Sequence, residues 1–254
     1  MSLLAPYLFS ACVLAGLMVA ACLAFGPELA PMPQDVVRVF ARLVADGDLL
    51  SELFVTVRRG VAGIFWANLV GVLLGVAAGL HAGLCRLTAP LVAAFQACPP
   101  LVWITLVMVW AGAGAAVPVA TVFAATLPFV FSTSAQGVMG LNRRVLALSR
   151  LYAVPRRRVL LSYVLPGMLP YWLAGFSTVL ATAWKAAAMA EFLGSHEGIG
   201  ARIFWSYHTL RMEELHAWTL ALVMLGVFLE CAVIAPLRRK AASLETRGSG
   251  TCSQ

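Results

Sequence analysis

Long apolar runs, each of about 20 residues, occupy most of this chain and leave few folds open to it. Hydrophobic residues fill 61% of the positions, charged residues fill 11%, and the mean hydropathy is +0.90. A transmembrane helix needs such runs, whereas a soluble domain does not tolerate them. We therefore expect an all-α integral membrane protein with about six transmembrane helices, at residues 6–25, 60–84, 87–110, 117–134, 166–189 and 215–237.

The surplus of positive charge does not indicate a nucleic-acid partner. The formal net charge is +7 and the pI is 9.4, but Lys and Arg collect at the ends of the apolar runs, where they set membrane topology. The six cysteines are scattered and are interpreted as small hydrophobic residues, and the four histidines show no metal-ligand spacing. We expect no metal site and no cofactor on this chain.

The basic segment at residues 140–165 fixes the expected orientation. Six of the eighteen Lys and Arg residues lie between Arg143 and Arg158, and short loops rich in these residues stay in the cytoplasm. Apolar residues at helical spacing flank Val154-Pro155, where a proline disfavours helix, so we predict a helix, a break and a second helix. With both termini inside, eleven Lys and Arg residues are cytoplasmic and six are outside, which supports six spans.

A ridge of small residues runs along the predicted span at 60–84. Small residues recur every fourth position, with Gly71, Gly75 and Gly79 at the centre of the ridge. Because such ridges let helix backbones approach closely in lipid, we expect this ridge inside the bundle or at a subunit interface. Arg58 and Arg59 precede the span on the predicted outer side, against the usual charge bias.

The span at 87–110 is interrupted by two prolines. Pro99 and Pro100 remove backbone donors and should kink or unwind the helix. Irregular backbone at membrane depth is tolerated where protein or a watery cavity covers it. Pro99, Pro100 and neighbouring Trp103 are therefore candidates for the lining of a translocation pathway, with a purely structural kink as the alternative.

Two ionisable residues lie toward the outer end of the fifth span. Lys185 and Glu191 are costly at bilayer depth, so functional groups of this kind usually face the bundle interior or water. Lys185 would then meet an anionic substrate in the pathway. The alternative for both residues is a position near the outer interface, where their side chains snorkel.

Two amphipathic segments are predicted on the outer side. Residues 34–45 are expected to form a helix lying on the outer surface, and residues 194–214 form an outer loop with a short amphipathic piece. The chain is divided into a first part at 1–49, with the first span and the amphipathic helix, a transmembrane domain at 50–237, and a polar cytoplasmic tail at 238–254.

The basic segment resembles the cytoplasmic coupling loop of binding-protein-dependent ABC import permeases. Their pattern is Glu-Ala-Ala, three residues, Gly, nine residues, then Ile-x-Leu-Pro. Here Ala147-Leu148-Ser149 stands in the place of Glu-Ala-Ala, Ala153 in that of Gly, and Tyr163 in that of Ile, before Leu165-Pro166. The spacing is kept, but the acid and the glycine are not. The following segment, at residues 165–194, is similar to the nitrate, sulfonate and taurine branch.

The resemblance implies a permease subunit of the bacterial inner membrane that works as a homodimer. Its implied partners are two ATPase subunits, which carry ATP and Mg²⁺, a periplasmic or lipid-anchored substrate-binding protein, and the membrane lipid. Its implied cargo is a small anion or zwitterion. The implied ATPase-coupling residues are Ala147, Leu148, Ser149, Arg150, Tyr152, Ala153, Pro155, Arg156, Arg157 and Arg158.

Two other function classes have less support. The chain has no GxxxxGK[ST] phosphate loop, so we expect no ATP hydrolysis of the P-loop type on this chain. An ion-coupled secondary transporter or a channel acting without an ATPase is the alternative, but no internal repeat is visible. A membrane enzyme would need a clustered nucleophile, base or metal set, and none stands out.

Overall fold

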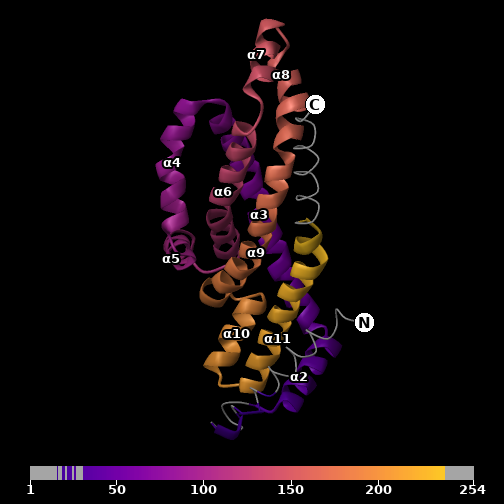
Figure 1. The fold of residues 1–254 in the computed structure, drawn as a ribbon. Coiled ribbons are helices and arrows are strands. Elements are labelled where there is room, and N and C mark those ends of the chain that lie inside the picture. Colours follow the sequence, from indigo (N-terminus) through magenta and orange to yellow (C-terminus); the bar gives the residue numbers. More distant parts are fainter. Residues whose placement is uncertain (1–15, 17–18, 21, 25, 27–30, 238–254) are drawn as a thin grey trace, which may run out of the picture.

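A computed structural model describes residues 16, 19–20, 22–24, 26 and 31–237. The predicted first span at 6–25 lies mostly outside these residues, and the predicted tail at 238–254 lies wholly outside them. Within the described part every regular element is a helix, as expected for an all-α membrane protein. The molecule is elongated, with helices α7 and α8 at one end and α2 and α10 at the other (Figure 1).

Three long helices form the centre of the bundle. They are α3 (Asp48–Leu80), α6 (Ala116–Met139) and α9 (Leu165–Gly194), and α6 packs against both of the others along its length. The small-residue ridge of α3 lies at the contact with α6. A Cβ added at Gly71 would lie 2.8 Å from Val130, and one added at Gly79 would lie 2.6 Å from Val138. The ridge therefore lets two backbones meet where no side chain fits.

The second predicted span differs from the observed helix. We predicted residues 60–84, but α3 begins twelve residues earlier, at Asp48, and ends at Leu80, so Gly83 belongs to the next helix. Arg58 and Arg59 therefore lie within α3. A 33-residue helix is about 50 Å long, more than the ~30 Å of a hydrocarbon core, so α3 extends beyond the membrane.

The two prolines divide the third predicted span into two helices. Helix α4 (Ala82–Ala97) and helix α5 (Pro100–Ala111) meet at an angle of 94°, with Pro99 in an extended conformation between them. The sequence predicted a kink or an unwound turn, and the structure has a right-angle break. In the described part, four helices are long and apolar enough to cross a membrane, or five if this bent pair counts as one span.

The basic segment forms a hairpin that projects from one end of the bundle (Figure 1). Helix α7 (Arg143–Leu151) is followed by a turn and by α8 (Arg156–Val159), in agreement with the predicted helix, break and helix. We call residues 143–159 the basic hairpin. A π-helical turn, η1 (Leu160–Val164), continues α8 directly into α9, so that residues 156–194 form one helical segment.

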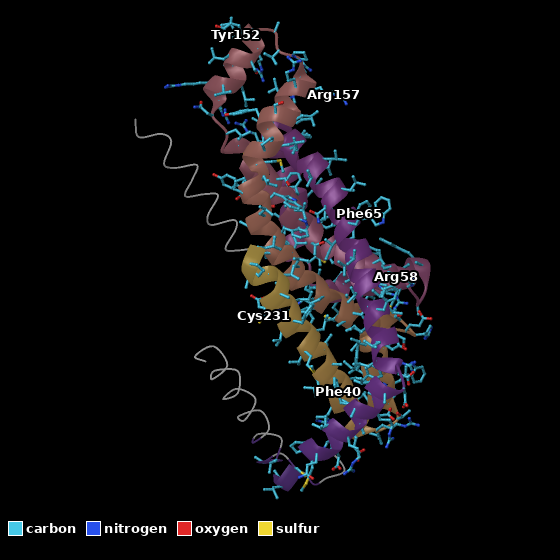
Figure 2. All side chains as sticks on the ribbon, turned by 90° about the vertical axis from the view of Figure 1, so that its right-hand side faces the viewer. Phe40, Arg58, Phe65, Tyr152, Arg157 and Cys231 are labelled. Atoms are coloured by element: carbon cyan, nitrogen blue, oxygen red, sulfur yellow. The ribbon has the colours of Figure 1, made fainter. Side chains whose placement is uncertain are left out.

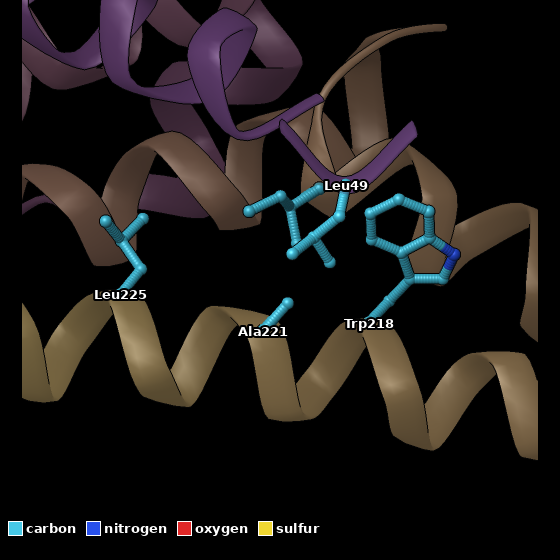
Figure 3. Packing of buried hydrophobic residues seen from close by; sticks show 5 residues of the cluster. Leu49, Trp218, Ala221 and Leu225 are labelled. Carbon is cyan, nitrogen blue, oxygen red and sulfur yellow. The ribbon is translucent and has the colours of Figure 1, made fainter. Parts of the chain in front are cut away.

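Shorter helices close the opposite end. Helix α2 (Pro33–Ala45), the predicted amphipathic helix, packs its apolar side against α11 (Met212–Leu229), which runs on into η2 (Glu230–Ile234). The segment predicted as an outer loop contains helix α10 (Ile199–His208). The core here consists of Leu49, Ile199, Trp218, Ala221 and Leu225 (Figure 3).

Candidate functional site

Local hydrogen bonds define both ends of α7 in the basic hairpin. The side chain of Asn142 accepts a hydrogen bond from the backbone N–H of Arg144 at 2.9 Å and caps the first turn. At the other end, the N–H of Val154 donates to the carbonyl of Ser149, and the N–H of Ala153 donates to that of Arg150. This is a Schellman motif, in which the residue after the helix adopts a left-handed conformation.

Ala153 occupies that left-handed position, with φ of +51°. Glycine is the residue that adopts this conformation without steric strain, because a Cβ crowds the backbone there. The geometry gives a physical reason for the glycine in the resembling pattern at this place. It also shows that the hairpin keeps its turn although alanine has replaced that glycine.

The tip of the hairpin exposes apolar side chains to the surroundings. Leu148 is 51% exposed, Leu151 79% and Tyr152 77%, and Tyr152 lies at the far end of the molecule (Figure 2). On the inner side of α7, Leu146 packs against the cluster that contains Val164. An exposed apolar tip on a short, well-capped hairpin has the character of a protein-docking surface.

The hairpin that carries this tip also carries six arginines, and each of them is exposed: Arg143, Arg144, Arg150, Arg156, Arg157 and Arg158. The other residues of the predicted coupling set, Ala147, Ser149 and Pro155, lie on the same hairpin. A cavity of about 520 Å³ separates the hairpin from the turn between α3 and α4, and Ser149, Arg150 and Arg156 line it together with His81.

Lys185 lies on an exposed face of α9 that carries other polar residues. Tyr171, Thr178, Thr182 and Lys185 follow one another at intervals of seven, four and three residues, which places them on one side of the helix. Tyr171, Thr178 and Lys185 are exposed, whereas Val179 and Ala183 on the adjoining face are buried. We call these four residues the polar stripe. Polar side chains of this kind are unfavourable against lipid, so the stripe is suited to water or to protein.

The candidates at the proline break lie on a different element. Trp103 stacks on Phe95 across the break, with ring centroids 4.6 Å apart, and its Nε1 is buried without a hydrogen-bond partner in the described structure. Helix α5 meets α9 where Ile104 packs against Ala190. Pro99 and Pro100 stand at the turn itself, between the end of α4 and the first turn of α5.

Glu191 lies in the interior of the bundle, which rules out the snorkelling alternative for this residue. Its side chain is fully buried. One carboxylate oxygen accepts hydrogen bonds from Thr56 Oγ1 at 2.8 Å and from the N–H of Gly200 at 3.3 Å, and the other lies 3.4 Å from Arg59 Nη1. The two partners on α3 are more than 130 residues away in the sequence, which is why no local pattern revealed them.

A network of polar groups surrounds Glu191 and joins α3 to the turn between α9 and α10; Glu52, Thr56, Arg59 and Ser195 are buried in it, whereas Glu197 and Arg202 are exposed. Arg59 donates to Ser195 Oγ, to the carbonyl of Glu197 and to the Glu197 carboxylate, at 2.7 to 3.0 Å. Glu52 accepts from the N–H of Gly198 and from the guanidinium of Arg202. We call this network the polar clamp; its members are Glu52, Thr56, Arg59, Glu191, Ser195, Glu197 and Arg202.

The sequence contained one signal for the polar clamp. Arg58 and Arg59 lay on the side of the membrane where positive charge is disfavoured. The structure shows that Arg59 is 4% exposed and paired with two carboxylates, whereas Arg58 is exposed. No group of three or more His, Cys, Asp or Glu side chains in the described part is arranged to hold a metal ion.

The sequence family described as "Binding-protein-dependent transport system inner membrane component" matches residues 67–235, well over half of the chain. The chain belongs to this family. It is therefore a permease component of an ABC transport system in the membrane. The matched range includes the basic hairpin, the polar stripe and Glu191, but it begins after Glu52, Thr56 and Arg59 of the polar clamp.

Individual relatives of this permease agree with the assignment. A protein of Methanocaldococcus jannaschii named as an ABC transporter permease is 24% identical over 209 residues, 80% of this chain and 78% of the relative. The taurine transport system permease protein TauC of Escherichia coli is 24% identical over 218 residues, 84% and 79% of the two chains. The nitrate import permease protein NrtB of Synechococcus elongatus is 25% identical over 158 residues, 62% and 56%.

A solved structure shares the fold of the permease. A chain from an inward-facing structure of the MetNI methionine ABC transporter superposes with a TM-score of 0.61 and covers 73% of this chain and 93% of that chain. The sequences are 18% identical, so the likeness shows the fold alone. The basic hairpin and the polar clamp thus lie on an importer-permease scaffold, at its two opposite ends.

Proposed function

We propose that the basic hairpin of this permease docks the ATPase subunit and that the polar stripe of α9 lines the translocation pathway. One observation carries this proposal: α8, the π-helical turn and α9 form a single helical segment from Arg156 to Gly194. The hairpin and Lys185 therefore lie on one continuous element. A force applied to the hairpin by a closing ATPase would tilt the face that carries Lys185, as in a rigid-body switch.

The assembly proposed from this arrangement has several partners. Two copies of the permease enclose the pathway, two ATPase subunits supply ATP and Mg²⁺, and a periplasmic or lipid-anchored binding protein delivers the solute. Both termini lie in the cytoplasm of a bacterial cell. The exposed polar stripe supports the presence of a second copy. Its polar side chains need to face water or another protein surface instead of lipid, and a second copy would enclose a water-filled space in front of them.

The proposed cargo is a small anion or zwitterion. Lys185 is the one lysine in the described part of the chain, and its side chain is exposed beside Trp184, 5.8 Å from the ring centroid. An ammonium group on a polar face attracts a sulfonate, nitrate or carboxylate. The names of the relatives, which transport taurine or import nitrate, support the same class.

Co-purification from the native host in mild detergent tests the assembly. We expect an ATPase subunit with a phosphate-binding loop in stoichiometric amount, and ATP-dependent solute uptake after reconstitution into liposomes. Recovery of the permease alone, with flux that needs no ATP, would replace the proposal with a channel or an ion-coupled carrier.

A further inference from the structure

The basic hairpin has no acidic side chain nearby in sequence to neutralise it. Between Glu52 and Glu191 the chain contains no Asp or Glu, and this stretch includes the whole hairpin. None of the six hairpin arginines forms an ion pair with another described residue. All the ion pairs among the described residues belong to α2, α3, α9 to α11 and their connecting turns.

The stability of α7 accounts for Arg150, which lies in its last turn, but not for Arg143 and Arg144. Arg143 and Arg144 occupy its first turn, where the helix dipole favours acidic side chains and disfavours basic ones. Membrane topology requires positive charge on this side, but not next to the exposed tip residues Leu151 and Tyr152. The arrangement therefore fits recognition of a negatively charged surface.

We infer that the basic hairpin fits a groove of the ATPase subunit that has an acidic rim and an apolar floor. This inference rests on the proposed function. Leu148, Leu151 and Tyr152 would fill the floor, since apolar anchors lie at the centre of interfaces. The surrounding arginines would face Asp and Glu side chains on the rim, where charges govern partner choice and the rate of association.

The charge on this hairpin is opposite in sign to the charge of the acidic residue in the family pattern. A permease with Glu in the place of Ala147 presents a negative charge at this point of the loop. This chain presents an uncharged residue there and six positive charges on the same hairpin. An ATPase groove built for the acid would lack carboxylates for these arginines, so the chain should discriminate in favour of its own ATPase.

An anionic lipid surface fits the geometry less well than a protein groove. Tyr152 lies at the very end of the molecule, farther from the bundle than Arg157 (Figure 2). Headgroups at the end of the bundle would reach the arginines near the root of the hairpin and leave its apolar tip in water. A groove in a protein covers tip and arginines together.

Zero-length cross-linking of the co-purified complex tests the inference directly. The chain has only two lysines, Lys185 and Lys240, so Arg150→Lys introduces a new amine beside the tip while keeping the charge. Carbodiimide then joins this amine to any carboxylate in contact, and mass spectrometry locates the bond. The matched control is Arg86→Lys, which places an exposed amine on α4, near the same end of the bundle but outside the hairpin.

We expect an amide between the new amine at position 150 and an Asp or Glu of the ATPase, and none from position 86. We also expect the affinity of the permease for the ATPase subunit to fall about tenfold between roughly 0.05 and 0.5 M NaCl, because salt screens such charge pairs.

An ATPase that co-purifies without the amide and without salt dependence would refute the acidic groove and leave the proposed function intact. Weaker binding of Arg150→Glu to phosphatidylglycerol vesicles, with unchanged ATPase binding, would assign the arginines to lipid instead. Absence of any ATPase would refute the proposed function itself.

Discussion

The two ends of this permease differ in whether their charged side chains are paired within the chain. At the end formed by α2 and α10, Arg59 and Arg202 are paired with carboxylates of the same chain, and Glu191 is sealed from solvent. At the hairpin end, six arginines are exposed and unpaired in the described structure. Paired charges hold the chain together, whereas unpaired charges beside an apolar tip are available to a partner. The following experiments test that division of roles.

Reversing the hairpin charges should have the largest effect. Replacing Arg156, Arg157 and Arg158 together by Glu should abolish co-purification of the ATPase and ATP-dependent uptake, because three attractive contacts become repulsive. The control is Arg38→Glu with Arg42→Glu on α2, which changes exposed charge at the other end and should leave binding intact. Retained assembly in the hairpin variant would contradict the docking role.

Breaking the polar clamp should strongly lower the thermal stability of the isolated permease, with no ATPase subunit present. Arg59→Met removes the cation that faces Glu191 and Glu197, and an uncompensated buried charge costs about 3–5 kcal/mol. The thermal midpoint in detergent should fall clearly. Arg58→Met is the matched control, because Arg58 is adjacent and exposed and should change the midpoint little. Equal midpoints for the two variants would show that the clamp is not structural.

Filling the contact between α3 and α6 should have an intermediate effect. Gly79→Ala places a Cβ 2.6 Å from Val138, and overpacking of this kind costs about 1–3 kcal/mol. Gly83→Ala has no atom within 4 Å and should be neutral or slightly stabilising. Thermal unfolding of the two variants in the same detergent measures the difference, and equal stability would place the ridge outside the packed centre.

Removing the charge of the polar stripe should affect transport and not assembly. Lys185→Ala should reduce uptake of an anionic solute about tenfold, equivalent to ~1.4 kcal/mol, because the pathway loses its attraction for the anion. Lys185→Arg keeps the charge and should retain most of the uptake. Unchanged uptake with alanine would mean that Lys185 lies near the interface with no role in the pathway.

The smallest effect is expected at the turn of the hairpin. Ala153→Gly should stabilise the hairpin by about 1 kcal/mol, since it relieves a left-handed alanine. The same change at Ala147, within α7, should have the opposite sign because glycine weakens a helix interior. Hydrogen exchange of the α7 amides reports both effects. Slower exchange with Gly at 147 than at 153 would contradict the assignment of the strain.

Local chemistry made much of the fold predictable. Val154-Pro155 predicted the break between α7 and α8, and the apolar spacing of residues 34–45 predicted α2. The spacing around Ala153 indicated the importer-permease family, to which the chain belongs. Each of these signals depends on residues within a few turns of one another, so the order of amino acids suffices to reveal it.

The amino-acid order thus determined that the chain is helical, embedded in a membrane and basic at one end. Only the tertiary structure decided the 94° break at Pro99 and Pro100, because proline ends a helix without fixing the direction of the next one. It also decided that Glu191 is a buried partner of Thr56 and Arg59. That contact depends on how far α3 extends and on which of its faces meets α9, and packing along the whole length of three helices sets both.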